Sequence, residues 1–233
     1  MKYISSLFLV VIISISNVLQ SQTSYIDYQS PFHPIISDGP MVVSQNHLSS
    51  ELGIEIIKKG GNAIDAAVAV GFSLAVTLPR AGNLGGGGFM LIYLKEQNEI
   101  LAIDYRGQSP SKLQANQIFG IELPRDYDKA DRDIVRYGYK ASTVPGTVSG
   151  LLLAHAEFGK LPLSEVMKPV IDQAMNGIDV SFDLEQAIAS APQLSWDDES
   201  RKIYLNDGKP LKEGSVMKRP DLAKTMSLIS KNG

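Results

Sequence analysis

The fold of this chain is decided by three segments: Gly60-Gly-Asn-Ala-Ile-Asp-Ala-Ala-Val-Ala-Val70, Ala81-Gly-Asn-Leu-Gly-Gly-Gly-Gly-Phe-Met90 and Asp104-Tyr-Arg106. They contain, in order, a capped apolar helix, four consecutive glycines and the end of a strand that carries an arginine. Four glycines in a row indicate a backbone that turns sharply or lets another group come very close. Our interpretation of function therefore depends on this part of the chain.

The first segment predicts a buried helix. Asn62 is a good N-cap, and Asp65 would lie near the positive end of the helix dipole. From Ala66 to Leu78 the sequence has no charged residue and is apolar on nearly every side, which is typical of a helix buried in protein or lipid. The run is too short to cross a membrane, and Pro79-Arg80 ends it. We therefore predict a central core helix.

The second and third segments frame a predicted β-hairpin. Phe89–Leu94 is a continuous apolar run of strand length, Gln97-Asn98 forms a turn, and Glu99–Tyr105 returns as a second strand. The side chains of a strand alternate between its two faces. One face of the second strand then carries Leu101, Ile103 and Tyr105, and the other carries Ala102, Asp104 and Arg106. Asp104 and Arg106 would therefore lie side by side.

Helices are predicted on both sides of these strands. Before them, we expect a short strand over Met41–Asn46 and a helix that is capped by Ser49 or Ser50 and ends near Gly60. After them, we expect helices from Pro145 to Gly159, from Pro169 to Asn176, from Phe182 to Ser190 and from Pro220 to Ser230. Helical pairs that flank strands are typical of a layered α/β or α+β fold, here with a helix-rich C-terminal half.

Composition excludes several classes of function. The 233 residues are 44% hydrophobic and 20% charged, as in an ordinary globular protein. The net charge of -3 and the lack of a basic tract argue against nucleic-acid binding. Because the chain has no cysteine, disulfides, thiolate nucleophiles and cysteine-ligated metals are excluded.

The N-terminus predicts a secretory signal. Lys2 supplies a positive charge, residues 7–15 form an apolar run, and small or polar residues follow. We expect residues 1–22 to act as a signal peptide, with Ser16 and Ser21 as candidate last residues before cleavage. The mature chain would then be exported to the periplasm or the extracellular space. An uncleaved membrane anchor is the alternative, although the apolar run is short for a bilayer span.

The glycine run is a poor match to a phosphate-binding loop. A dinucleotide-binding fingerprint has a strand before the glycines and a helix after them, whereas here the helix comes first. No Gly-Lys-Ser/Thr follows the run, so it is not a P-loop either. We favour a loop that packs closely against other backbone.

No metal site is predicted. Four aspartates superficially resemble a calcium loop: Asp126, Asp128, Asp131 and Asp133. An EF-hand would need glycine and glutamate where this chain has Asp131 and Tyr137, so a solvated loop with balanced charges is favoured. The three histidines lack the spacing of metal ligands and are expected at the surface or the edge of the core: His33, His47 and His155.

No nucleophile with a neighbouring base is predicted either. Ser-x-x-Lys occurs at Ser109 and at Ser215, but no Lys-Thr-Gly segment accompanies it. Arg106 is the candidate that remains. A guanidinium at a strand end, with Asp104 on the same face, can hold a carboxylate ligand through two hydrogen bonds. The alternative is a surface ion pair between the two residues, worth at most about 1 kcal/mol.

Five segments of the chain together resemble gamma-glutamyltranspeptidases. Besides the helix segment and the glycine run, they are Ile103-Asp-Tyr-Arg-Gly-Gln-Ser-Pro110, Val144-Pro-Gly-Thr-Val-Ser-Gly150 and Leu161-Pro-Leu163. The resemblance runs from about Met41 to the C-terminus. It implies an exported proenzyme with the N-terminal nucleophile hydrolase fold, layered αββα. Such proenzymes cut themselves into a large and a small subunit, and residues 23–233 would be the truncated N-terminal portion of the large subunit.

The resemblance also implies a reaction. In this family the new N-terminal threonine of the small subunit attacks the γ-glutamyl amide of glutathione or a related compound, and no cofactor is needed. The glutamyl group then passes to water or to an amino acid or peptide acceptor. Thr143, Thr147 and Thr225 do not match that threonine, whose segment lies downstream. The chain alone is therefore expected to be inactive.

One site residue follows from the resemblance. Arg106 matches the large-subunit arginine that binds the α-carboxylate of the glutamyl group, although Gly107-Gln108-Ser109 stands where Glu-Met-Ala is often found. Two alternatives stay open. One is a β-lactam (cephalosporin) acylase of the same fold, and the other is a non-catalytic secreted module that keeps Arg106 for binding.

Overall fold

The computed structural model of the chain describes residues 36–113 and 141–233. Residues Pro40–Gly233 form one compact unit, separate from Met1–Gly39. The predicted signal peptide, His33 and the four aspartates between residues 126 and 133 lie outside the described residues. Within the described ranges, no helix combines the length and apolar character that a membrane span requires.

Helix α2 (His47–Lys58) is capped by Asn46, whose side chain accepts a backbone N–H of the first turn. The predicted cap at Ser49 or Ser50 is wrong, because the helix has already begun there. Ser49 is instead fully buried, and its hydroxyl lies 2.8 Å from two hydroxyls of the next helix. The helix ends as predicted, with Gly60 just beyond it at a φ of +97° that favours glycine.

Helix α3 (Ala63–Thr77) is the core helix of the unit, as predicted. Asn62 and Asp65 form a capping box at its N-terminus, so two backbone donors that the helix leaves free are satisfied. Val68 and Phe72 are fully buried within the hydrophobic core. Helix α3 therefore supplies the centre against which the other helices pack.

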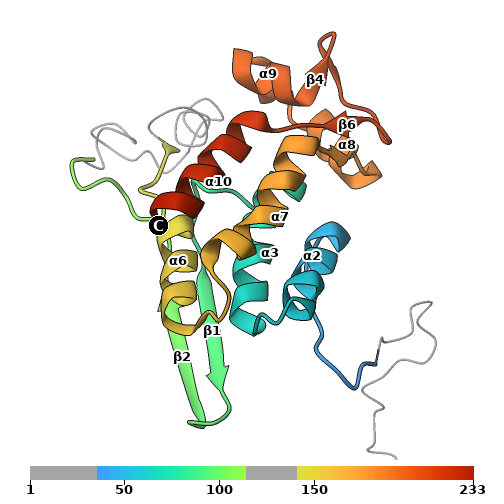
Figure 1. The fold of residues 1–233 in the computed structure, drawn as a ribbon. Helices are drawn as coiled ribbons and strands as arrows, with labels where there is room; N and C mark the ends of the chain where they lie inside the picture. The colour runs from blue at the N-terminus through green and yellow to red at the C-terminus, as the bar shows by residue number, and fades with distance from the viewer. Residues whose placement is uncertain (1–35, 114–140) are drawn as a thin grey trace, which may run out of the picture. The chain divides into compact units, whose positions relative to one another are not determined.

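Three more helices complete the helical layer: α6 (Thr147–Phe158), α7 (Leu163–Asn176) and α10 (Pro220–Asn232). Helices α2, α6 and α7 contact α3, and α10 lies along α7 (Figure 1). The predicted starts at Pro145 and Pro169 are wrong, since α6 begins after Pro145 and α7 contains Pro169. Burial of the apolar face of α7 in the core outweighs the hydrogen bond that Pro169 cannot donate.

The remaining short elements follow α7. Helix α8 begins after its cap Ser181, and the predicted helices at residues 182–190 and 220–230 are both confirmed. The elements are α8 (Phe182–Ala189), the 3-10 helix η2 (Pro192–Ser195), α9 (Asp198–Tyr204), and the strand pairs β3 (Ile178–Asp179) with β6 (Val216–Met217) and β4 (Leu205–Asn206) with β5 (Lys209–Pro210).

The predicted hairpin is present as β1 (Phe89–Leu94) and β2 (Glu99–Asp104). The two strands are antiparallel, with Phe89 opposite Asp104 and Leu94 opposite Glu99. Strand β2 contacts α6, so one face of the hairpin lies against the helical layer (Figure 1). The fold of the described residues is thus a layer of helices with the β1–β2 hairpin beside it and two shorter strand pairs near the C-terminal helices.

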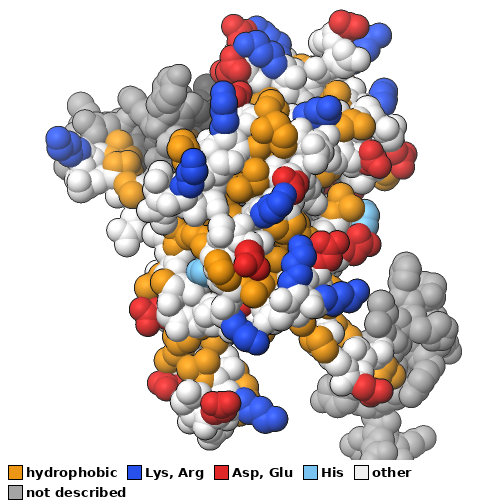
Figure 2. All heavy atoms as spheres, viewed as in Figure 1, with side chains coloured by type: hydrophobic (Ala, Val, Ile, Leu, Met, Phe, Trp, Pro, Cys, Tyr) orange, Lys and Arg blue, Asp and Glu red, His pale blue; other side chains and the backbone are white. Residues whose placement is uncertain are grey.

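The other face of the hairpin is apolar and uncovered. We call it the hairpin outer face: Phe89, Leu91, Tyr93, Ile100 and Ala102. Leu91 is 77% exposed and Ile100 is 71% exposed. Figure 2 shows hydrophobic side chains gathered over the hairpin, with charged side chains at its tip. An apolar patch of this kind on a protein surface is typical of an interaction site.

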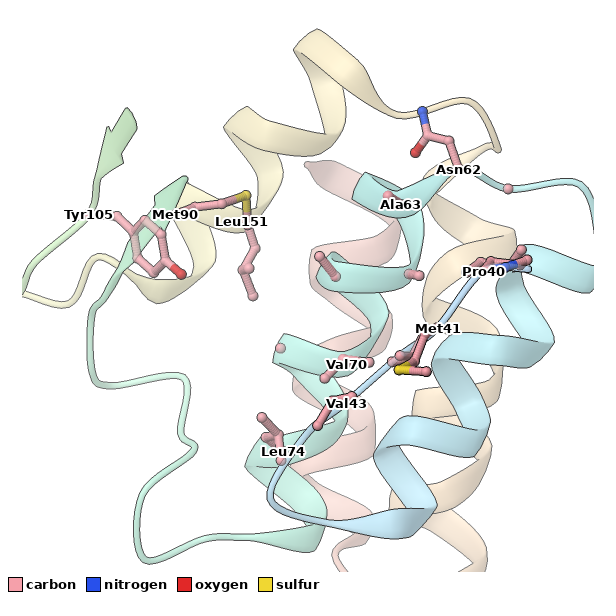
Figure 3. A pocket seen from close by; sticks show the side chains of 16 residues that line it. Pro40, Met41, Val43, Asn62, Ala63, Val70, Leu74, Met90, Tyr105 and Leu151 are labelled. Carbon is pink, nitrogen blue, oxygen red and sulfur yellow. The ribbon is translucent and has the colours of Figure 1, made fainter. Parts of the chain in front are cut away.

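The predicted strand over Met41–Asn46 is wrong. Among the described residues no strand pairs with this segment, and a strand needs a partner to satisfy its backbone groups. Residues 40–43 instead border a groove of about 650 Å³, which we call the α3 groove (Figure 3). Its floor is the half-exposed side of α3, and Met90, Tyr105 and Leu151 line the opposite wall. Like the hairpin outer face, the groove is apolar.

Candidate functional site

Arg106 follows the end of β2 and is exposed. The predicted alternation is confirmed along this strand: Leu101, Ile103 and Tyr105 are partly buried, whereas Ala102, Asp104 and Arg106 are exposed. Although the strand is assigned only to Asp104, its pairing continues by one residue through Tyr105 and Gly88. The arginine therefore leaves the backbone on the same side as the hairpin outer face.

The glycine run packs against the backbone on either side of Arg106. A Cβ added to Gly87 would lie 2.3 Å from the backbone nitrogen of Gly107, a distance that side chains do not tolerate. The carbonyl of Gly86 accepts hydrogen bonds from the N–H groups of Gly146 and Thr147 at 2.8 and 3.1 Å. The predicted close-packed loop is therefore confirmed, and the run joins the strand end to the start of α6.

Two glycines complete this packing: Gly146, the N-cap of α6, and Gly150 within the helix. A Cβ on Gly146 would lie 2.0 Å from the carbonyl oxygen of Tyr105, and one on Gly150 would lie 2.1 Å from the Tyr105 ring. Sequence reasoning gave neither glycine a role. The signal was present, because two glycines four residues apart lie on the same side of a helix and let a neighbouring chain approach.

A pocket of about 260 Å³ lies beside Arg106. Its polar lining comes from Asp104, Arg106, Gln108 and Ser149, and apolar residues of the strand end and α6 supply the rest. Burial raises the pKa of the Tyr105 phenol, so this lining residue stays uncharged at neutral pH. The pocket therefore has a mixed polar and apolar lining with two charged side chains, Arg106 and Asp104.

Asp104 does not neutralise that charge in the structure. Its Oδ1 accepts the backbone N–H of Arg106 at 2.9 Å. Across the described part of the chain, no carboxylate lies within ion-pair distance of the Arg106 guanidinium. The alternative of a surface ion pair between Asp104 and Arg106 is therefore absent from the structure. The guanidinium is left able to bind a carboxylate ligand.

The other candidates have structural roles. Nε2 of His155 lies 2.9 Å from the carbonyl oxygen of Leu161 and 3.6 Å from Oδ1 of Asp65, at the edge of the core as predicted. Asp65 is fully buried and accepts the backbone N–H groups of Lys160 and Leu161. His47 is exposed. In residues 36–113 and 141–233, no three metal-ligating side chains are grouped together.

Three of the serines and threonines that sequence analysis considered bond to nearby backbone or lie beside it. Ser215 donates its hydroxyl to the carbonyl of Lys212, and Thr225 donates to the carbonyl of Asp221. Thr143 lies beside Gly107, where its Oγ1 would be 2.7 Å from an added Cβ. These contacts give none of the three the arrangement of an activated nucleophile.

The sequence and the fold of this chain were compared with those of known proteins. A sequence model of the Gamma-glutamyltranspeptidase family matches residues 49–233. The Glutathione hydrolase proenzyme of Escherichia coli (strain K12) is 38% identical over 212 residues, which cover 90% of this chain and 36% of that protein. The chain therefore spans about a third of the length of such relatives.

Solved structures agree with the sequence match. Helicobacter pylori gamma-Glutamyltranspeptidase superimposes with a TM-score of 0.77 and 35% identity, covering 85% of this chain and 56% of that one. A cephalosporin acylase from Bacillus halodurans gives a TM-score of 0.69 at 24% identity, covering 88% of this chain and 39% of that one. At that identity the acylase shows a shared fold alone.

Proposed function

This chain belongs to the gamma-glutamyltranspeptidase family, and on that premise we propose that it carries the glutamyl-carboxylate-binding part of an exported enzyme. The enzyme would cleave the γ-glutamyl amide of glutathione and related compounds. It would pass the glutamyl group to water or to an amino acid or peptide acceptor. One observation carries the proposal: Arg106 lines a pocket, with its guanidinium unpaired among the described residues.

Arg106 would bind the substrate rather than act on its amide bond. Its planar guanidinium can donate two parallel hydrogen bonds to the α-carboxylate of the glutamyl group, which fixes both the position and the rotation of that group. The attacking hydroxyl would come from the N-terminal threonine of the small subunit, whose own α-amino group can take the proton. We therefore assign no catalytic residue to this chain and expect it to be inactive alone.

The missing layer of the fold would come from that small subunit. The hairpin outer face and the α3 groove are two apolar surfaces on the unit Pro40–Gly233. Burying such surface contributes roughly 25 cal/mol per Å². We propose that strands of the same proenzyme cover both surfaces and complete the αββα layers, so that Arg106 comes to lie inside a closed site.

The N-terminus would direct export. We propose that residues 1–22 are a signal peptide and that the protein acts in the periplasm or outside the cell. Mass spectrometry of the secreted or periplasmic product should find a mature N-terminus after Ser16 or Ser21. Recovery of the intact N-terminus in the membrane fraction would instead support the uncleaved anchor.

Activity measurements test the proposal in two steps. Residues 23–233, purified alone, should not hydrolyse a γ-glutamyl anilide, and clear turnover would contradict a downstream nucleophile. The second step uses a hybrid proenzyme, in which residues 49–233 replace the matching segment of the Escherichia coli protein. The hybrid should process itself and release the anilide. A hybrid that hydrolyses cephalosporin amides and leaves γ-glutamyl anilides intact would favour the acylase alternative.

Substitution in the hybrid tests Arg106 itself. Arg106→Ala should weaken glutamyl binding by roughly 2–5 kcal/mol if the carboxylate pair is buried, which appears as a raised KM. Arg106→Lys should recover only part of the loss, because an ammonium cannot donate the two parallel bonds. Arg80→Ala is the matched control, since Arg80 is an exposed arginine that pairs with Asp183 on the surface. An unchanged KM and kcat in Arg106→Ala would remove Arg106 from the site.

A further inference from the structure

Arg106 lies between two short backbone ladders. On one side, Tyr105 and Gly88 exchange two hydrogen bonds, with N···O distances of 3.0 and 3.2 Å. On the other side, Gln108 and Val144 exchange two more, at 2.8 and 3.1 Å. Only the backbone of Arg106 and its neighbour Gly107 lies between the two ladders. The position of the guanidinium therefore depends on how this dipeptide is held.

Gly87 packs against the backbone of this dipeptide, and Gly146 packs against the carbonyl of Tyr105, the residue before it. These contacts limit how far the backbone can shift, but they do not satisfy the N–H of Arg106. That N–H is bonded to the side chain of Asp104, two residues earlier, at 2.9 Å. Such a bond from an Asp side chain to the N–H two residues on is a common way to stabilise a turn.

We infer that Asp104 is a positioning residue for Arg106. Asp104 acts in this way on the premise that Arg106 binds the glutamyl carboxylate, as proposed above. By accepting the Arg106 N–H, the Asp104 carboxylate fixes the backbone from which the guanidinium extends. The same bond engages the Asp104 carboxylate with backbone, which leaves the guanidinium for the ligand.

The charge of Asp104 by itself would not help the ligand. A second carboxylate near the glutamyl α-carboxylate repels it, because like charges at short range raise the free energy of the complex. The benefit of Asp104 must therefore come through its hydrogen bond to backbone. Asparagine keeps the side-chain oxygen that accepts this bond and removes the charge, so it should replace aspartate without loss.

The hydrogen bond can be tested on the full 233-residue chain, without any enzymatic activity. In ¹⁵N-labelled protein, Asp104→Ala should shift the Arg106 amide resonance and speed the hydrogen exchange of that N–H by roughly tenfold. The amide of Phe72, in the buried core helix, should be unchanged in both respects. Asp104→Asn should restore the Arg106 resonance and its exchange rate to near the wild-type values.

Two results would overturn the role of Asp104. One is an Arg106 amide that is the same in Asp104→Ala as in wild type. The other is faster exchange at Phe72 as well, since that would make Asp104 a residue that stabilises the whole fold. Ser149→Ala is the matched control, because Ser149 lines the same pocket and donates to the carbonyl of Gly146. Ser149→Ala should leave the resonance and the exchange rate of the Arg106 amide unchanged.

Kinetics in the hybrid proenzyme test the consequence for substrate. Asp104→Ala should raise KM for the γ-glutamyl anilide by about tenfold with a smaller change in kcat, and Asp104→Asn should not. In an Arg106→Ala background, Asp104→Ala should add nothing, because it acts only through the arginine. Additive losses would show that Asp104 acts independently of Arg106. If Arg106→Ala itself has no effect, the proposed function fails, while the amide measurements still decide whether Asp104 holds the backbone.

Discussion

The helical layer and the hairpin of this chain differ in how completely they are buried. In the helical layer, α3 packs against α2, α6 and α7 and leaves one side to the α3 groove, while Phe72 has no exposed surface. In the hairpin, one face lies against the helices while the hairpin outer face is open, with Leu91 77% exposed. The helices therefore bury an apolar core of their own, whereas the hairpin carries Arg106 next to an exposed apolar face that the proposed second layer would cover.

The difference separates residues that hold the fold from residues that serve the site. Much of the quoted Gly60–Val70 segment is used for stability, as Asn62 and Asp65 bind the turn between α6 and α7. Substitutions in the helical layer should therefore cost stability in the chain alone. Substitutions on the hairpin outer face should cost little until the covering layer is present.

The largest loss of stability is expected in the centre of α3. Phe72→Ala should lower the free energy of unfolding by about 3–5 kcal/mol, because it leaves a cavity in a closed core. Urea denaturation of the purified chain measures the change. A loss below about 1 kcal/mol would mean that the core around Phe72 is not tightly packed. The contrast between a buried helical core and an exposed hairpin face would then be wrong.

The next largest effect is expected at Asp65. Asp65→Ala should cost about 3 kcal/mol, because the partly buried N–H groups of Asn62, Lys160 and Leu161 lose their buried acceptor. Asp65→Asn is the control that keeps one oxygen acceptor, and it should cost less. Equal losses in the two variants would show that charge, and not hydrogen bonding, sets the role of Asp65.

A moderate effect is expected where α6 meets the strand end. Gly146→Ala should cost about 2 kcal/mol and displace the backbone near Arg106, because the new Cβ would lie 2.0 Å from the carbonyl oxygen of Tyr105. Gly85→Ala is the matched control, since the nearest atom to its new Cβ would be Oδ1 of Asn83, at an ordinary contact distance of 3.7 Å. Denaturation curves measure the loss of stability, and the Arg106 amide resonance reports the displacement of the backbone. Similar changes in both variants would contradict the close contact at Gly146.

The smallest effect is expected on the hairpin outer face. Leu91→Ala should change the stability of the chain alone by no more than about 0.5 kcal/mol, because the side chain is already exposed. In the hybrid proenzyme the same substitution should cost about 2–5 kcal/mol, if the covering layer buries Leu91. A large loss in the chain alone would show that the face is already covered there.

Much of the helical layer and the hairpin could be predicted from sequence, because both have strong local patterns. The uninterrupted apolar run before Pro79 predicted α3, and the alternation from Leu101 to Arg106 predicted the faces of β2. The errors arose where tertiary contacts decide. Packing of α7 overrides Pro169, and Met41–Asn46 looks like a strand but has no strand partner in the described ranges.

The candidate site was predicted in part. Arg106 was predicted from its place at a strand end and from the family resemblance, and its role in binding a carboxylate stays a prediction. The contacts of Gly146 and Gly150 with Tyr105 were missed, because they join segments about forty residues apart that no local pattern connects. The bond from Asp104 to the Arg106 backbone was missed because sequence analysis considered only the two side chains.

The most direct test of the central claim uses two substrates that differ only in the α-carboxylate. They are a γ-glutamyl anilide and the matching 4-aminobutyryl anilide, each measured as kcat/KM in the hybrid proenzyme with Arg106 and with Arg106→Ala. With Arg106 present, the substrate that has the carboxylate should be preferred by about a hundredfold or more, and Arg106→Ala should remove most of that preference. A preference that survives intact in Arg106→Ala would show that another group binds the carboxylate and would contradict the account.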